Sequence, residues 1–76
     1  MTRIAINGSK GKMGQTLIEA INLNENVDLG VGLDKGDNLN NSLEDFDVLI
    51  DFSRPDATLN AISICMSSAK AMVIGT

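Results

Sequence analysis

Three glycines spaced three residues apart, Gly8, Gly11 and Gly14, constrain the fold of this chain more than any other feature. Residues 4–7 before them carry isoleucine at alternate positions, a pattern typical of a buried strand. Residues 13–21 after them have apolar side chains at the spacing of one helix face. The glycines therefore lie in a turn that leads from a strand into a helix.

A glycine turn in this position is suited to binding a pyrophosphate. Gly8 lets the chain leave the strand sharply, Gly11 leaves room for a phosphate at the main chain, and Gly14 lets the helix pack close to the sheet. Free amides and the positive end of the helix dipole then favour an anion. The alternative is a glycine-rich turn with no ligand. The strand before it and the helix after it favour a dinucleotide site.

Composition limits the remaining possibilities. The 76 residues allow one small domain, and a single cysteine without any histidine excludes an internal disulfide and a Cys/His metal site. Cys65 lies in an apolar helical pattern, so we expect a core residue rather than a reactive thiol. A net charge of −4 and two aromatic residues argue against a nucleic-acid partner. Without a membrane-span or signal-peptide pattern, we expect a soluble cytoplasmic protein.

An acidic residue follows the second predicted strand, which covers residues 27–33. Asp34 lies 20 residues beyond Gly14, where a dinucleotide-binding unit carries an acidic side chain that accepts hydrogen bonds from the adenosine ribose. Lys35 beside it could neutralise a 2′-phosphate, so the pair suggests that both NADH and NADPH are accepted. The alternative for each residue is a solvated position in a turn.

The middle of the chain has less regular patterns. Gly30 and Gly32 lie on the same side of the second strand, so we expect the first helix to pack closely there. A helical turn with Ser42 as its N-cap is predicted next, followed by a third strand over 47–52. The segment between the second and third strands is too short for a full helix. We therefore expect the third strand beside the first, and the order 2-1-3-4 with a fourth strand over 71–74.

This order brings the end of the third strand to the glycine turn. Ligands of open parallel sheets bind beyond the carboxyl ends of the strands where the strand order reverses, so Phe52 and Ser53 are expected at the cofactor. The alternative for Ser53 is a cap on the helix that begins at Pro55. The apolar face predicted for that helix carries Leu59, Ile62 and Met66.

The alternation of strands with helices and turns predicts an α/β fold, a Rossmann-type parallel sheet of about four strands. Gly75 and Thr76 follow the fourth strand on the ligand side. That strand would be a flat apolar edge with no helix after it. We therefore expect residues 1–76 to be a partial NAD(P)-binding domain, the front part of a longer protein.

Three blocks of the sequence resemble one enzyme family. Residues 4–14, 47–59 and 72–76 are similar, in this order, to segments of 4-hydroxy-tetrahydrodipicolinate reductase, also called dihydrodipicolinate reductase. The middle block matches the family's Asp-Phe-(Thr/Ser)-x-Pro-(Glu/Asp) segment and is more specific than the glycine turn. The resemblance implies reduction of a cyclic intermediate on the bacterial route to diaminopimelate and lysine, with NADH or NADPH as the cofactor.

The resemblance also implies roles for individual residues. The pyrophosphate would be wrapped by Gly8, Ser9, Lys10, Gly11, Lys12 and Met13. The adenosine ribose would lie at Asp34 and Lys35, and the nicotinamide side would be lined by Phe52, Ser53, Gly75 and Thr76. Lys12 stands where the family usually has arginine, and lysine keeps the charge without the bidentate fork.

Two features depart from the family pattern. The linker between Asp34 and Asp47 is short compared with many members. The family's second half, which supplies the substrate-binding domain, the catalytic motif and most contacts of a homotetramer, has no counterpart in this chain. We therefore expect no catalytic residue here, and expect a substrate to be bound through that missing domain.

Two other functions remain open at this point. One is a stand-alone dinucleotide-binding module, such as a redox-sensing domain, and the other is a different amino-acid-pathway dehydrogenase of the same architecture. The Asp-Phe-Ser-Arg-Pro block favours the reductase, because a sensor has no evident need for that strand end.

Overall fold

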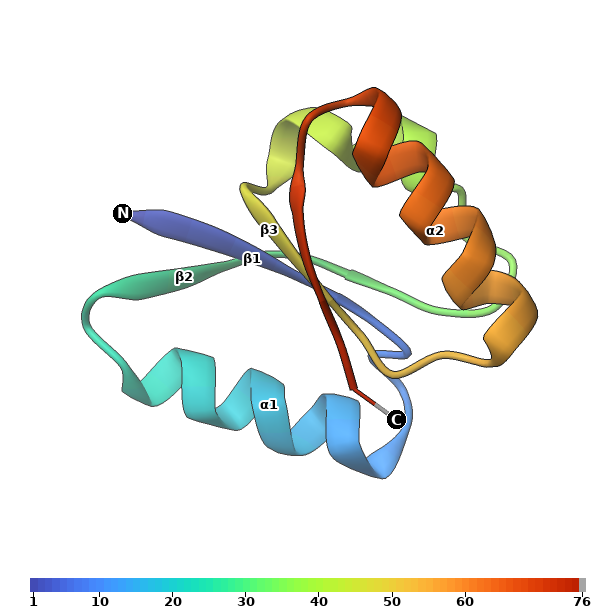
Figure 1. Cartoon of the computed structure of the whole chain (residues 1–76). Helices are drawn as coiled ribbons and strands as arrows, with labels where there is room; N and C mark the ends of the chain where they lie inside the picture. Colours follow the sequence, from blue (N-terminus) through green and yellow to red (C-terminus); the bar gives the residue numbers. More distant parts are fainter. Residues whose placement is uncertain (76) are drawn as a thin grey trace.

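The computed structural model describes residues 1–75 and contains four strands and three helical segments (Figure 1). In chain order the elements are β1 (Thr2–Asn7), α1 (Lys12–Leu23), β2 (Val27–Leu33), the 3-10 helix η1 (Leu39–Asp45), β3 (Val48–Asp51), α2 (Pro55–Ser67) and β4 (Ala71–Ile74). The predicted role of Thr76 lies outside the described residues.

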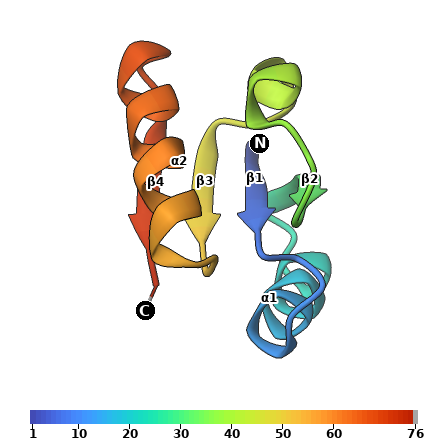
Figure 2. The same cartoon turned by 90° about the vertical axis from the view of Figure 1, so that its right-hand side faces the viewer.

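All four strands form one parallel sheet in the order β2-β1-β3-β4, as predicted. Figures 1 and 2 show α1 on one face of this sheet, with α2 and η1 on the opposite face. Strand order reverses at β1, because β2 lies on one side of it and β3 on the other. The carboxyl ends of β1, β2 and β3 therefore meet at one edge of the sheet, where open parallel sheets bind ligands.

The crossover from β2 to β3 is made by η1 rather than by an α-helix, which agrees with the short segment available. Its N-cap is Asn38, whose side-chain oxygen accepts a hydrogen bond from the amide of Asn40 at 3.0 Å. The prediction of Ser42 as the N-cap was therefore wrong. Asparagine can close such a turn with its own side chain two residues ahead, so the helix begins earlier than its serine.

The core lies between the sheet and the layer formed by η1 and α2. The main cluster there consists of Ala5, Leu33, Leu39, Phe46, Leu49, Ala61 and Cys65, of which Phe46 is the largest, and Ile6 and Ile21 are buried outside it. Cys65 is 2% exposed, which confirms its predicted place in the core. Removal from water, with a smaller effect of the Asp51 carboxylate, raises the pKa of the Cys65 thiol. The thiol therefore stays protonated and unreactive.

The inner face of α2 differs from the prediction. Leu59 and Met66 are 68% and 78% exposed, whereas Ala61 and Cys65, spaced by one turn, are buried. Small side chains on the inner face let α2 lie close to the sheet, so the packed face is the one with less apolar volume. Met13, predicted on the inner face of α1, is likewise half exposed.

Gly30 accommodates η1 rather than α1. The β1–β2 pairing shifts between Ile4 and Ala5, whose partners are Leu29 and Val31, so Gly30 is the extra residue of a bulge. A Cβ atom at Gly30 would overlap the carbonyl oxygen of Asp45 at the end of η1. At Gly32 the near neighbour is the side chain of Ser9, with 3.2 Å to its Cβ. The close approach of α1 predicted for these glycines was therefore wrong.

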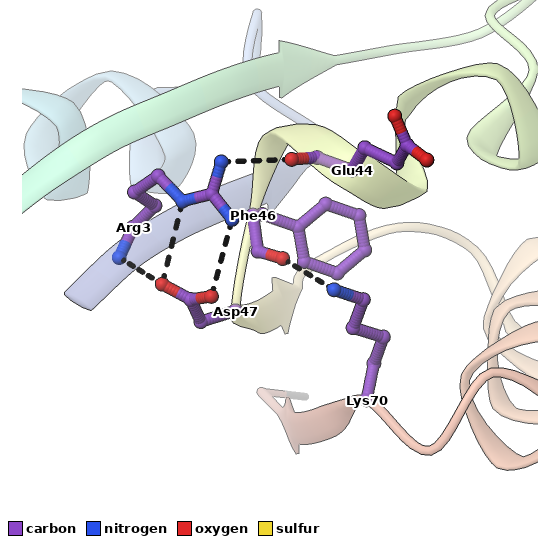
Figure 3. A network of polar contacts seen from close by, with 5 residues as sticks. All are labelled: Arg3, Glu44, Phe46, Asp47 and Lys70. Carbon is purple, nitrogen blue, oxygen red and sulfur yellow. Dashed lines mark hydrogen bonds and ion pairs between the residues drawn. The ribbon is translucent and has the colours of Figure 1, made fainter.

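A polar network ties the elements together at the amino-terminal end of the sheet (Figure 3). The backbone amide of Arg3 donates to Asp47 at 2.8 Å, its guanidinium pairs with the same carboxylate at 3.2 Å, and it also donates to the carbonyl of Glu44 at 2.7 Å. The Nζ atom of Lys70 donates to the carbonyl of Phe46 at 2.9 Å and lies 5.5 Å from the centre of its ring. These contacts join β1, the end of η1 and the start of β4.

Asp47 makes this network sensitive to pH. The hydrogen bond from the Arg3 amide, followed by the Arg3 guanidinium, lowers the pKa of the Asp47 carboxyl below 3.8. A depressed pKa stabilises the fold above the unfolded-state pKa, and this stabilisation is lost as the pH falls through the folded-state value. We expect Asp47→Asn to lower the melting temperature at pH 7, and the difference from wild type to shrink at pH 3.

Thermal unfolding followed by circular dichroism at both pH values checks this expectation. Glu25→Gln is the matched control, because Glu25 is an exposed loop residue with no side-chain hydrogen bond among residues 1–75. A melting-temperature difference between wild type and Asp47→Asn that stays the same at both pH values would contradict the role of the Asp47 charge.

Candidate functional site

The glycine turn is held against the end of β2 by two backbone hydrogen bonds. Gly8 has a φ of +91°, a conformation that favours glycine, and it turns the chain directly after β1. The amides of Gly8 and Ser9 both donate to the carbonyl of Leu33, at 2.8 and 2.9 Å. A Cβ atom at Gly14 would overlap the carbonyl oxygen of Gly8 and lie 2.8 Å from the Cα of Ser9. Helix α1 therefore begins in direct contact with the turn.

The first turn of α1 offers free hydrogen-bond donors. Its N-cap is Gly11, which has no side chain to cap the helix, and the first bond along the helix runs from the amide of Gln15 to Gly11 at 3.0 Å. Within residues 1–75, the amides of Lys12, Met13 and Gly14 have no acceptor. Such amides, together with the positive end of the helix dipole, attract an anion. The nearest atom to a Cβ at Gly11 is 3.5 Å away, so a ligand can approach here.

Asp34 is fixed beside this turn by backbone amides. One oxygen of its carboxylate accepts from the amide of Lys10 and the other from the amide of Lys35, each at 2.7 Å. The bond from Lys35, followed by that from Lys10, lowers the pKa of the Asp34 carboxyl. A carboxylate has about four acceptor positions, so after these two bonds it can still accept hydroxyl groups.

The segment after β3 forms the third wall of the site. The amide of Phe52 donates to the carbonyl of Asn7 at 3.0 Å, which keeps this segment beside the end of β1. The amide of Ser53 donates to Oδ1 of Asp51 at 2.8 Å, and the Ser53 hydroxyl donates to the same oxygen. The N-cap of α2 is Arg54, without a side-chain cap. The alternative reading of Ser53 as a cap was therefore wrong, because its hydroxyl is engaged by Asp51.

These walls enclose a cleft of about 660 Å³ at the carboxyl ends of β1, β2 and β3. Six of the residues predicted at a cofactor line it: Gly8, Gly11, Asp34, Lys35, Phe52 and Ser53. The glycine turn, Asp34 and the Ser53 segment thus border one space, although they come from three separate parts of the chain.

Five further predicted residues lie outside the lining of this cleft. Ser9 is 8% exposed and packs against Gly32, whereas the side chains of Lys10, Lys12 and Met13 are exposed beside the turn. Gly75 donates its amide to the carbonyl of Asp51 at 2.8 Å and lies against the ring of Phe52, where any side chain would overlap that ring. Gly75 therefore supports a wall of the cleft rather than lining it.

Sequence reasoning missed several lining residues. Asn7 ends β1 and lines the cleft, a place that the rule about strand ends could have identified. Ala57, Asn60 and Ala61 line it from one face of α2, where their spacing of three and four residues is the signal. Arg54 adds a positive side chain at the start of that helix.

The fold and the cleft define a Rossmann-type α/β domain, with its cleft at the point where the strand order reverses. Comparison with known proteins then identifies the family. The model of the family described as "Dihydrodipicolinate reductase, N-terminus" matches residues 2–76, so the chain belongs to this family. The matched region is the cofactor-binding region of the family.

Two similar proteins support this assignment. The 4-hydroxy-tetrahydrodipicolinate reductase of Hahella chejuensis (strain KCTC 2396) is 39% identical over 99 aligned positions, which cover 100% of this chain and 37% of the relative. The structure of a dipicolinate-bound dihydrodipicolinate reductase from Paenisporosarcina sp. TG-14 superposes with a TM-score of 0.86 at 26% identity, over 100% of this chain and 37% of that one. The chain thus spans about a third of the length of either protein.

Neither helix α1 nor α2, nor any other helix within residues 1–75, is long and apolar enough to cross a membrane.

The two glycines at the start of α1 should respond differently to alanine. Gly11→Ala meets no close neighbour, so it should cost about 1 kcal/mol of stability at most and weaken NADH binding about tenfold or more, because the new methyl group occupies the ligand's approach. Gly14→Ala should cost about 1–3 kcal/mol, because its methyl group overlaps the turn. Urea unfolding and NADH fluorescence titration measure the two effects.

Ser63→Ala is the control for this pair, since Ser63 is an exposed residue of α2 that does not line the cleft. Equal NADH affinity of Gly11→Ala and wild type would contradict an approach of the phosphate at Gly11.

Proposed function

We propose that this chain is the cofactor-binding part of an NAD(P)H-dependent reductase of 4-hydroxy-tetrahydrodipicolinate in lysine and diaminopimelate biosynthesis. The observation that carries the proposal is a cleft lined by Asp34 and by Gly11, the N-cap of α1, next to which the amides of the first helical turn are free. Membership in the reductase family supports this function over a stand-alone sensor module and over a different dehydrogenase.

In this proposal different residues of the cleft bind different parts of the dinucleotide. The pyrophosphate binds at the amides of the first turn of α1, next to Gly11. The hydroxyl groups of the adenosine ribose donate hydrogen bonds to the carboxylate of Asp34. The nicotinamide half lies toward Phe52 and Ser53, on the side where Gly75 follows β4. The cofactor supplies a hydride when bound, and the protein's part is to hold and orient it.

No residue of this chain is assigned a catalytic role. The chain spans 37% of the length of these relatives, so we place substrate binding and proton transfer in a further domain of the longer protein. By the same resemblance, the full-length protein is proposed to be a cytoplasmic homotetramer that binds a small-molecule substrate, without nucleic-acid or membrane partners.

Both nicotinamide cofactors are compatible with the ribose end of the cleft. Asp34 suits the free 2′-hydroxyl of NADH. Two exposed lysines flank Asp34, Lys35 next to it in the chain and Lys10 in the glycine turn, and their ammonium groups suit the 2′-phosphate of NADPH. The opposite charges compensate each other, so neither cofactor is excluded.

Replacing Asp34 by its isosteric amide should separate the two cofactors. Asp34→Asn keeps an acceptor oxygen for the turn but loses the charge, so NADH binding should weaken about three- to tenfold. NADPH binding should stay the same or strengthen, because a negative charge no longer faces the 2′-phosphate. Fluorescence titration of both cofactors measures the two dissociation constants.

Asp28→Asn is the matched control, because Asp28 is an exposed acidic residue of β2 that does not line the cleft. If a demonstrably folded wild-type chain binds neither cofactor, the proposed function is wrong and the glycines form only a turn.

A further inference from the structure

Asp51 is a buried carboxyl group whose hydrogen bonds all go to one residue. Its side chain is 0% exposed at the carboxyl end of β3. Oδ1 accepts both the amide and the hydroxyl of Ser53, while Oδ2 is buried with no partner among residues 1–75. Burying a carboxyl group with an unpaired oxygen is costly, so an apolar residue would suit this core position better. The feature that only Asp51 provides is its hold on Ser53.

This hold fixes the direction of the Ser53 hydroxyl. The Ser53 amide donates to Oδ1 as well, so this one oxygen accepts from both polar groups of Ser53. The hydroxyl hydrogen is therefore directed at Asp51. A hydroxyl has one hydrogen and two lone pairs, so Ser53 can only accept hydrogen bonds from its other neighbours.

The lone pairs of Ser53 are only weakly used within the chain. The side-chain amide of Asn7 lies 3.5 Å from Oγ, and the hydroxyl of Thr58 lies 3.4 Å away. Both distances are at the outer limit for a hydrogen bond. Because Ser53 lines the cleft, a donor on a ligand can compete for the same lone pairs.

Backbone hydrogen bonds of Asp51 and Phe52 keep the Ser53 hydroxyl in place. The carbonyl of Asp51 accepts from the amide of Gly75 at 2.8 Å, and the amide of Phe52 donates to Asn7 at 3.0 Å. The segment is thus bonded to β1 on one side and to the end of β4 on the other. Ser53 follows directly after this bonded segment, and its own hydrogen bonds to Asp51 fix its hydroxyl as well.

We propose that Asp51 is a positioning residue that makes Ser53 an acceptor-only contact, which selects a hydrogen-bond donor on the nicotinamide half of the dinucleotide. This inference rests on the proposed function. The donor is either the amine of the carboxamide or a hydroxyl of the nicotinamide ribose, and both offer the same N–H or O–H chemistry to the Ser53 oxygen.

The test compares NADH with ADP, which shares the pyrophosphate and adenosine ribose but lacks the nicotinamide half. Ser53→Ala and Asp51→Ala should each weaken NADH about five- to tenfold and leave ADP within about twofold of wild type. Asp51→Asn, unlike Asp51→Ala, should bind NADH about as tightly as the wild type does, because the asparagine carbonyl oxygen can accept the same two hydrogen bonds from Ser53. A merely structural role of Asp51 would weaken both ligands together.

The 3-acetylpyridine analogue of NADH, which has no amide donor, distinguishes the two sources. If the carboxamide is the donor, the analogue binds the wild type more weakly and Ser53→Ala has no further effect. If the ribose is the donor, the analogue binds like NADH and Ser53→Ala weakens both. Either result supports the proposal.

Two outcomes would overturn it. One is a folded Ser53→Ala variant with an unchanged ratio of NADH to ADP affinity, which remains decisive if Asp51→Ala does not fold. The other is an Asp51→Asn variant as weak as Asp51→Ala while both bind ADP normally. Absence of ADP binding to the wild type would instead contradict the proposed function itself.

Discussion

The carbonyl of Leu33 and the carboxylate of Asp34 together hold the glycine turn to the end of β2, and the arrangement of the cleft depends on these bonds. Leu33 accepts from the amides of Gly8 and Ser9, and Asp34 accepts from the amide of Lys10. Three consecutive amides of the turn are therefore bound to the last residue of β2 and to the residue that follows it. The amides of Lys12, Met13 and Gly14, at the start of α1, are left free for a ligand.

The opposite end of the sheet supplies the rigidity that this arrangement needs. The Arg3–Asp47 pair and the Lys70–Phe46 contact join β1, η1 and β4 there, about one strand length from the cleft. Both members of the ion pair are about half exposed, so its contribution to stability is modest, and most of the stability comes from the buried cluster around Phe46. The stabilising polar contacts thus lie at the amino-terminal end of the sheet and the free donors at the carboxyl end, as expected of a binding domain.

Much of the fold follows from periodicity, and the errors come from contacts that periodicity does not contain. Alternating isoleucines in β1 and the short segment before β3 predicted the sheet order, and Asp34 was found by its distance from Gly14. The bulge at Gly30 depends on the Asp45 carbonyl across the crossover, which no local pattern shows. Which face of α2 is buried depends on how close the helix lies to the sheet, so Ala61 is buried there and Leu59 is exposed. For Ser53 the sequence left open a contact with the cofactor or a helix cap, and only the hydrogen bond to Asp51 across the buried strand end excludes the cap.

Backbone amide shifts during titration with NADH test most directly the claim that the glycine turn and Asp34 form the dinucleotide site. In two-dimensional ¹H–¹⁵N spectra, we expect the largest saturable shifts at the amides of Lys12, Met13 and Gly14, with further shifts at Lys35. The amides of Arg3 and Lys70 at the far end of the sheet should stay in place. Saturable shifts centred on that far end, or none in a folded chain, would contradict the account.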